Sequence, residues 1–180
     1  MIKILFKTLF AFSLLVLMAF VVKKQPLKTV PDFLSLESRW VDSVFASLNT
    51  DQRIAQLFMV AAYSNKDMKH VAEIRELVEN YNIGGLIFMQ GGPMREAKLN
   101  NYYQSKAKTP LLISIDGEWG LAMRLDSTIS YPKQMALGAA ANEKHCYTLG
   151  KQMAEQCQRL GVHLSFSPVA DIFCKAIVDL

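Results

Sequence analysis

The stretch PLLISIDGEWG, from Pro110 to Gly120, joins an apolar segment of strand length to a short polar segment. Pro110–Ile115 carries no charge and is largely apolar, as expected of a strand buried on both faces of a parallel sheet. Asp116, Glu118 and Trp119 follow within four residues. In parallel α/β folds the functional groups lie at the carboxyl ends of the strands. The stretch therefore predicts a buried strand that ends in a functional loop.

The same pattern recurs on both sides of this stretch. The strand starts predicted near residues 56, 83, 110 and 161 leave a third interval much longer than the first two, so Gly117–Ala141 is expected to be an insertion. Alternation of such strands with helices predicts an α/β fold with a parallel sheet. The other predicted strands are residues 56–62, 83–89 and 161–167. The predicted helices are residues 38–48, 67–81, 93–106 and 142–160. A further short helix runs into Ile54 and is capped by Asn49 or Thr50, with Gln52 as the capping-box partner of Asn49.

The composition of the 180 residues excludes several classes of protein. The chain is 51% hydrophobic and 20% charged, which is typical of a folded globular protein and unlike a disordered or collagen-like chain. Its net charge of +4 is too small and too evenly spread to indicate nucleic-acid binding.

The N-terminus is typical of an exported protein. Lys3 and Lys7 begin it, and Thr8–Val22 is an uncharged, mainly apolar run. This predicts that residues 1–22 are a signal peptide or an uncleaved N-terminal anchor, because the run is shorter than the roughly 20 residues that a spanning helix needs. Residues 23–37 are expected to be a linker. The body of the protein is then expected in the periplasm or outside the cell, with membrane contact only through residues 1–22.

Cysteines and histidines give no sign of a redox or metal centre. Cys146, Cys157 and Cys174 are an odd number of thiols, which favours buried free cysteines over a disulfide framework. His70 is expected to be solvated, and the spacing of the three histidines does not suggest metal ligation.

The polar residues at the predicted strand ends allow several interpretations. Asp116 and Glu118 suggest a glycosidase carboxylate pair, although an acid after a strand can also cap a helix or hold a turn. Trp119 can stack on a sugar ring or fill the core. Gly84-Gly85 and Gly91-Gly92 would let a phosphate approach the backbone, but neither pair belongs to a phosphate-binding motif.

Five blocks of sequence stand in a characteristic order: QRIAQLFMV, IGGLIFMQGG, PLLISIDGEWGLAMRL, YPKQMALGAA and LGVHLSFSPVADI. Together they resemble the N-terminal domain of family 3 glycoside hydrolases. The resemblance runs from about Trp40 to Asp171 and is greatest to the exported, Bacteroidetes-like β-N-acetylglucosaminidase (β-N-acetylhexosaminidase) branch. It implies that residues 38–180 are the N-terminal half of a (β/α)8 barrel domain of the TIM type, incomplete at about four strand–helix units.

The resemblance also implies an activity and roles for particular residues. Family members hydrolyse terminal β-linked sugars with retention, here N-acetylglucosamine from cell-wall or chitin-derived oligosaccharides, without a metal or organic cofactor. Asp116 matches the sugar-binding aspartate, so it is expected to grip a sugar rather than attack it. Glu118, Trp119 and Arg124 are expected to support it, with Arg124 orienting the loop by pairing with Glu118. Asp171 is expected to be structural.

The nucleophile and the acid/base of the family are expected beyond residue 171, so no catalytic residue is expected in these 180 residues. The chain is therefore expected to be a fragment, inactive alone and prone to association, because four strand–helix units cannot close a barrel. Three alternatives remain open: a non-catalytic sugar-binding remnant, a β-glucosidase-type specificity within the family, and an exported phosphate-binding barrel.

Overall fold

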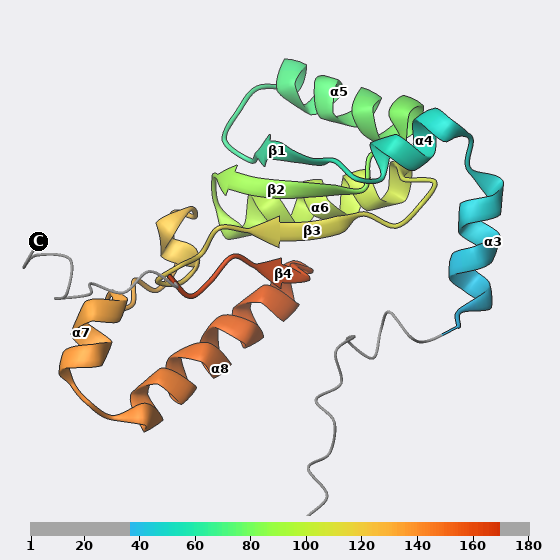
Figure 1. The fold of residues 1–180 in the computed structure, drawn as a ribbon. Coiled ribbons are helices and arrows are strands. Elements are labelled where there is room, and N and C mark those ends of the chain that lie inside the picture. The colour runs from blue at the N-terminus through green and yellow to red at the C-terminus, as the bar shows by residue number, and fades with distance from the viewer. Residues whose placement is uncertain (1–36, 170–180) are drawn as a thin grey trace, which may run out of the picture. The chain divides into compact units, whose positions relative to one another are not determined.

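The computed structural model describes residues 37–169, which include every predicted strand and helix (Figure 1). The predicted leader, most of the linker, Asp171 and Cys174 lie outside the described residues. The chain divides into two compact units, Met1–Arg39 and Trp40–Leu180, and the description below concerns the second. Among the residues that are described, none of the helices has the length and apolar character needed to cross a membrane.

Four parallel strands form one sheet, as predicted. They are β1 (Met59–Tyr63), β2 (Gly85–Gln90), β3 (Leu112–Ile115) and β4 (Leu164–Ser165). The strand order in the sheet is the order in the chain, β1-β2-β3-β4. Parallel neighbours in chain order are what the first strands of a (β/α)8 barrel require.

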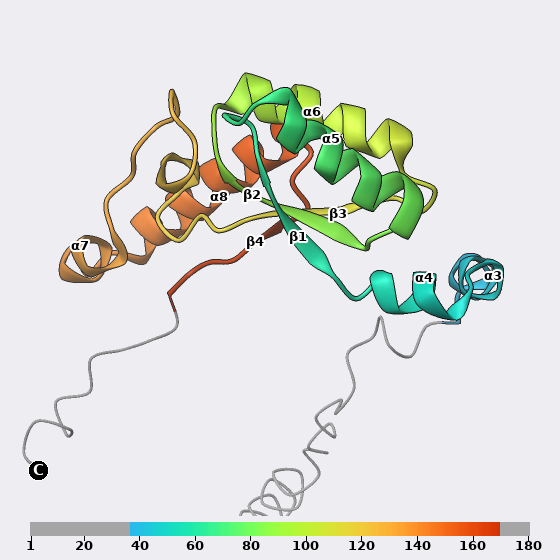
Figure 2. The same cartoon turned by 90° about the horizontal axis from the view of Figure 1, so that it is seen from above.

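Helices that connect the strands cover one face of this sheet (Figure 2). α5 (Met68–Glu76) continues into a π-helical turn, η1 (Leu77–Tyr81), and joins β1 to β2. α6 (Pro93–Lys106) joins β2 to β3 and has the bounds predicted from the sequence. α8 (Glu143–Leu160) precedes β4 and packs against α6.

The hydrophobic core lies between these helices and the sheet. Alternate strand residues point into it, because successive side chains of a strand lie on opposite faces. The fully buried residues of the core include Leu86 and Phe88 of β2, Ile113 and Ile115 of β3, and Tyr103 of α6.

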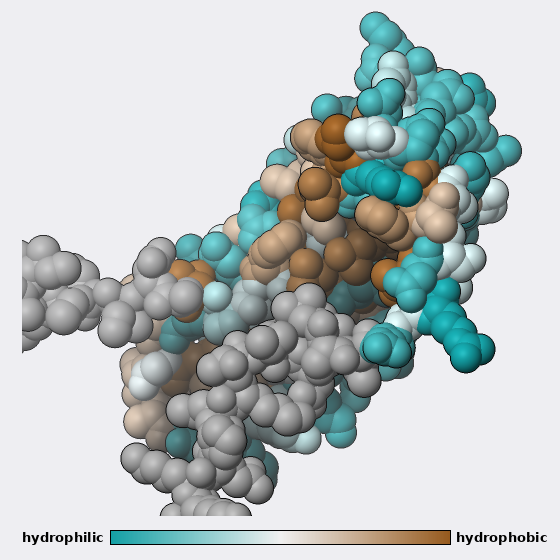
Figure 3. Space-filling view, turned by 45° about the vertical axis from the view of Figure 1, so that its right-hand side comes forward, coloured by the Kyte–Doolittle hydropathy of each residue, from teal (hydrophilic) through white to brown (hydrophobic). Residues whose placement is uncertain are grey.

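The opposite face of the sheet is apolar and open. Leu112 of β3 is 47% exposed and Leu164 of β4 is 41% exposed. Figure 3 shows hydrophobic side chains gathered in the middle of the molecular surface in view. In a closed barrel this face of the sheet lines the interior.

Two short helices precede β1. α3 (Arg39–Ser47) has the predicted helical conformation, and its side chains Trp40, Val41 and Phe45 are all exposed. α4 (Thr50–Ala55) begins at the predicted capping box: the Asn49 side chain accepts from the Gln52 amide at 2.8 Å, and the Asn49 amide donates to Gln52 Oε1 at 3.2 Å. Both predictions of helix are confirmed.

The strand limits differ from the sequence pattern at two places. The predicted first strand started at Gln56, but the amides of Leu57 and Phe58 still donate to carbonyl groups of α4, so β1 starts at Met59. The predicted fourth strand, 161–167, is reduced to Leu164–Ser165, since Gly161 is the left-handed cap of α8. Both strands were predicted too long because apolar residues at a helix end have the same character as strand residues in the sequence.

Two side-chain expectations are wrong. Cys146 and Cys157 are free thiols, as expected, but Cys146 is exposed rather than buried. His70 is half-buried rather than solvated: its Nε2 accepts from the Tyr63 amide at 3.2 Å, and its ring meets the Tyr63 ring edge to face. Burial first, and then the charge of Lys66, lowers the pKa of His70.

Candidate functional site

Three chain segments meet at the end of the sheet where the parallel strands have their carboxyl ends. Ser64 follows β1, Gly91 and Gly92 follow β2, and Asp116 follows β3. The segment after Asp116 forms a short 3-10 helix, η2 (Leu121–Met123), which is anchored by the fully buried Leu121. We call residues 116–128 the Asp116 loop.

Asp116 is paired with Arg124 of the same loop. The Arg124 guanidinium donates through Nη2 to Asp116 Oδ2 and through Nε to the Asp116 carbonyl oxygen, the latter at 3.1 Å. Both side chains are partly buried, with 26% of the Asp116 side chain and 20% of the Arg124 side chain exposed. Within residues 37–169, Oδ1 of Asp116 receives no hydrogen bond, so one carboxylate oxygen is available to a ligand.

The pairing corrects the expectation for Arg124. The sequence predicted that Arg124 would orient the loop by pairing with Glu118, but its partner is Asp116. The reason is the tight turn after β3: the amide of Gly120 donates to the Gly117 carbonyl, and that of Arg124 donates to the Leu121 carbonyl. This turn returns the Arg124 backbone toward the end of β3.

Glu118 and Trp119 lie half-buried at the tip of the same turn. The Glu118 carbonyl accepts from Gln134 Nε2 of α7 (Gln134–Ala139), which ties the loop to the insertion. Lys133 Nζ lies 5.1 Å from the centre of the Trp119 ring. Trp119 is therefore a partly exposed residue of the Asp116 loop and does not belong to the hydrophobic core.

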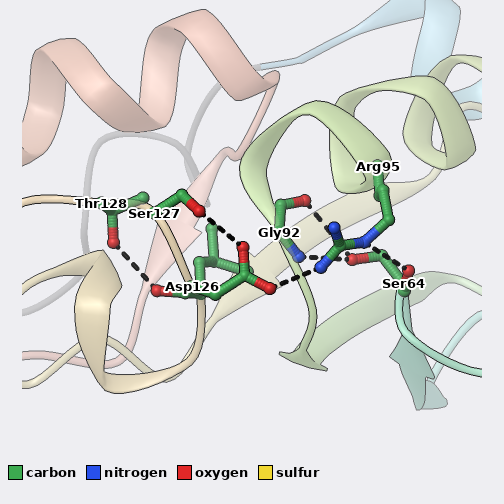
Figure 4. Close-up of polar contacts among 7 residues, drawn as sticks. Ser64, Gly92, Arg95, Asp126, Ser127 and Thr128 are labelled. Atoms are coloured by element: carbon green, nitrogen blue, oxygen red, sulfur yellow. Dashed lines mark hydrogen bonds and ion pairs between the residues drawn. The ribbon is translucent and has the colours of Figure 1, made fainter.

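A second polar cluster at this edge was not predicted (Figure 4). Arg95 Nη2 lies 2.5 Å from Asp126 Oδ2, and Arg95 Nε donates to the Ser64 carbonyl at 3.2 Å. The Gly92 amide donates to Ser64 Oγ at 3.1 Å. These residues come from three different strand ends, and 31 positions separate Arg95 from Asp126, so no local pattern in the sequence indicates the contact.

Close packing accounts for the two glycine pairs. Gly91 has φ +146°, and a Cβ there would overlap Ser64 Oγ. A Cβ on Gly84 would overlap the Gln56 carbonyl oxygen. Protein atoms therefore occupy the space that the phosphate interpretation needed, and that interpretation loses its support.

A groove of about 910 Å³ lies between α7 and α8 and reaches the carboxyl end of β4 at Ser165 and Ser167. Its walls include Leu149 and Met153 of α8, with Glu118 on its lining. Asp116 and Arg124 do not line it. The end of β3 is the better candidate site, because it carries the paired charged groups of Asp116 and Arg124.

The structure brings most of the expected site residues together. Asp116, Glu118, Trp119 and Arg124 share one loop at the end of β3, while Asp171 lies outside the described residues. In the described part of the chain, no three His, Cys, Asp or Glu side chains gather in a way that would hold a metal ion.

The sequence also matches a known family over most of its length. Residues 49–176 match the model of the glycosyl hydrolase family 3 N terminal domain. The chain belongs to glycosyl hydrolase family 3. The family assignment agrees with the parallel sheet of the fold.

Curated members of the family share low identity with this chain. A beta-N-acetylglucosaminidase/beta-glucosidase from Cellulomonas fimi is 26% identical over 133 residues, which are 74% of this chain and 23% of that protein. Beta-hexosaminidase LpqI from Mycobacterium tuberculosis is 25% identical, covering 71% and 32%. A beta-hexosaminidase from Actinobacillus succinogenes is 33% identical, covering 58% and 33%. The chain thus spans about a quarter to a third of the length of these relatives.

Solved structures confirm the fold. The beta-glucoside phosphorylase BglX bound to 2FGlc superimposes with a TM-score of 0.68 at 19% identity, over 84% of this chain and 26% of that one. An exo-1,3/1,4-beta-glucanase, ExoP, from a Pseudoalteromonas species gives a TM-score of 0.55 at 16% identity, over 72% and 22%. The described sheet, with the helices that connect its strands, therefore corresponds to the first four strand–helix units of an incomplete TIM-type barrel.

Proposed function

We propose that the chain is the N-terminal part of a retaining β-N-acetylhexosaminidase that removes terminal β-linked N-acetylglucosamine. Its substrates are amino-sugar oligosaccharides derived from the cell wall or from chitin. Family membership supports a glycoside hydrolase, and the names of the relatives from Mycobacterium tuberculosis and Actinobacillus succinogenes support the amino-sugar specificity.

The observation that carries this proposal is the Asp116–Arg124 pair at the end of β3. Arg124 fixes one carboxylate oxygen and leaves the other for a ligand. An ionised carboxylate accepts hydrogen bonds from sugar hydroxyl groups more strongly than a neutral acceptor does. Asp116 is thus a substrate-binding residue, oriented rather than reactive.

The neighbouring residues complete a sugar subsite. The half-exposed Trp119 offers an aromatic surface to the apolar face of a sugar ring. Glu118 adds a second acidic side chain to the Asp116 loop.

Cleavage with retention needs a nucleophile and an acid that later acts as a base, and in most glycosidase families both are carboxyl groups about 5 Å apart. We place both beyond residue 171, in the family blocks that follow. The 180 residues are therefore expected to bind a sugar but not to hydrolyse a glycoside. We also propose that the protein is exported, because residues 1–22 have a basic start and an uncharged apolar run.

A second candidate is a β-glucosidase-type specificity in the same family. The name of the Cellulomonas fimi relative joins both activities, which favours this alternative. A sugar-binding remnant without catalysis is a third interpretation of the same Asp116 site.

Titration of the 180-residue chain with N-acetylglucosamine and with glucose, followed by calorimetry, tests the proposal. N-acetylglucosamine should bind better than glucose. Asp116→Asn should weaken binding at least about tenfold, because hydrogen bonds to a charged group are lost. Asp42→Asn, an exposed acid of α3, is the matched control and should bind as the unchanged chain does.

Hydrolysis of an aryl β-N-acetylglucosaminide tests the placement of the catalytic groups. The 180-residue chain should give no hydrolysis, and the same chain extended by the following family blocks should be active. Hydrolysis by the 180 residues would contradict our placement of the nucleophile. Preference for glucose would favour the second candidate.

A further inference from the structure

The Asp116 loop is held at its far end by the backbone of Gly91. The Gly91 amide donates to the Arg124 carbonyl at 3.3 Å, and the Asp126 amide donates to the Gly91 carbonyl at 2.8 Å. Gly91 thus pairs with Leu125 as an isolated parallel bridge next to β2. The two bonds lie on either side of Leu125, and one of them is accepted by the Arg124 carbonyl. They therefore fix the position of the Arg124 backbone, from which its side chain extends to Asp116.

Arg95 fixes the same segment through a side chain. Its Nη2 contacts Asp126 Oδ2 at 2.5 Å, and its Nε donates to the Ser64 carbonyl at 3.2 Å. Asp126 Oδ1 also accepts from Ser127 Oγ at 3.0 Å. Arg95 therefore joins the end of β1 and the start of α6 to the Asp116 loop (Figure 4).

These contacts form a continuous path from Arg95 to Asp116. Arg95 holds Asp126, the Asp126 amide holds Gly91, and Arg124 lies two residues before Asp126 with its guanidinium on Asp116. We propose that Arg95 is a positioning residue for Asp116 and acts through Asp126 and Arg124. The proposal deepens the proposed function and rests on it for what Asp116 binds.

If the Arg95–Asp126 ion pair only stabilised the fold, its loss would lower the global stability of the chain. The Arg95 and Asp126 side chains are 53% and 57% exposed, and exposed pairs contribute little to global stability. Loss of the pair should therefore leave the unfolding transition nearly unchanged while it loosens residues 124–126. The local effect and the global effect can be measured separately.

Hydrogen exchange of the Arg124 Nε–H group, followed by NMR, tests the proposal without any sugar. R95Q and D126N should each speed this exchange about fivefold, and the double variant should show little further change, because each single variant already removes the Arg95–Asp126 ion pair. R95K should restore part of the protection. R75Q is the matched control: it breaks the Arg75–Glu79 pair on α5 and η1, which is also partly exposed, and should not change Arg124.

Affinity for N-acetylglucosamine gives the functional readout. R95Q and D126N should weaken binding about three- to fivefold at an unchanged midpoint of urea unfolding, again without additivity. Additive losses, or unchanged Arg124 exchange in R95Q, would overturn the role of Arg95. Failure of the unchanged chain to bind any sugar would contradict the proposed function, and the exchange data alone would then decide whether Arg95 orders the Arg124–Asp116 pair.

Discussion

Gly91 has both a backbone conformation and a neighbour that only glycine tolerates. Its φ is +146°, and a Cβ at this position would overlap Ser64 Oγ. Gly91→Ala should therefore lower the free energy of unfolding by at least about 2 kcal/mol. It should also disturb the Arg124–Asp116 pair, because the Gly91 backbone bonds to the carbonyl of Arg124 and to the amide of Asp126.

Urea unfolding of Gly91→Ala and of a matched variant, Gly150→Ala, checks this prediction. Gly150 lies inside α8, and a Cβ there would meet no atom within 4 Å. Alanine should stabilise that helix by about 0.5–1 kcal/mol. Equal midpoints for the two variants would show that the packing at Ser64 relaxes without cost.

Residue-level reasoning predicted correctly that Asp116 follows a buried strand, but it did not predict the side-chain contacts at that strand end. The position of Asp116 followed from its place directly after an apolar run, which is a local feature. The partner of Arg124 depended on a turn through Gly117–Gly120, and the partner of Arg95 lies 31 residues away. Such pairings are set by the three-dimensional course of the chain, so the sequence left them open.

At the scale of elements, the contact between α6 and α8 buries an acid. Glu96 is fully buried, and neither of its carboxyl oxygens has a hydrogen-bond partner among the described residues. Burial raises its pKa from 4.5 to about 7. Across the contact, burial first and then the Glu96 charge raise the pKa of the Cys157 thiol of α8.

This burial predicts a stability that falls as the pH rises. Between pH 4.5 and about 7 the folded chain keeps the Glu96 proton while the unfolded chain releases it, so folding becomes less favourable through this window. The loss should total about 3 kcal/mol by pH 8. Denaturation at pH 5 and pH 8 measures it. Glu96→Gln should remove most of the pH dependence of stability. Glu76→Gln, a change at an exposed residue of α5, should leave that dependence in place.

The elements themselves were predictable where one physical signal dominated. α6 begins where predicted because Pro93 suits the first turn of a helix. β1 and β4 are shorter than predicted because apolar residues next to them, such as Leu57 and Val162, belong to helix ends and turns. Apolar character predicts burial or sheet proximity, but not where the hydrogen-bonded ladder begins.

At the scale of the molecule, the described sheet has two unpaired edges and one open apolar face. β1 and β4 each pair with a single neighbour, and Leu112 and Leu164 of the open face are exposed. Closed barrels have no such edges. The 180-residue chain should therefore associate in a concentration-dependent way, because association removes apolar surface and strand edges from water.

Sedimentation velocity over a range of concentrations tests this behaviour. Leu112→Lys and Leu164→Lys place charges on the open face and should shift the chain toward the monomer. Met135→Lys, a change at an exposed residue of α7, is the matched control and should leave association unchanged. A monomer with a sharp, cooperative unfolding transition at all concentrations would contradict the prediction, and would mean that four strand–helix units of this family are a folding unit on their own.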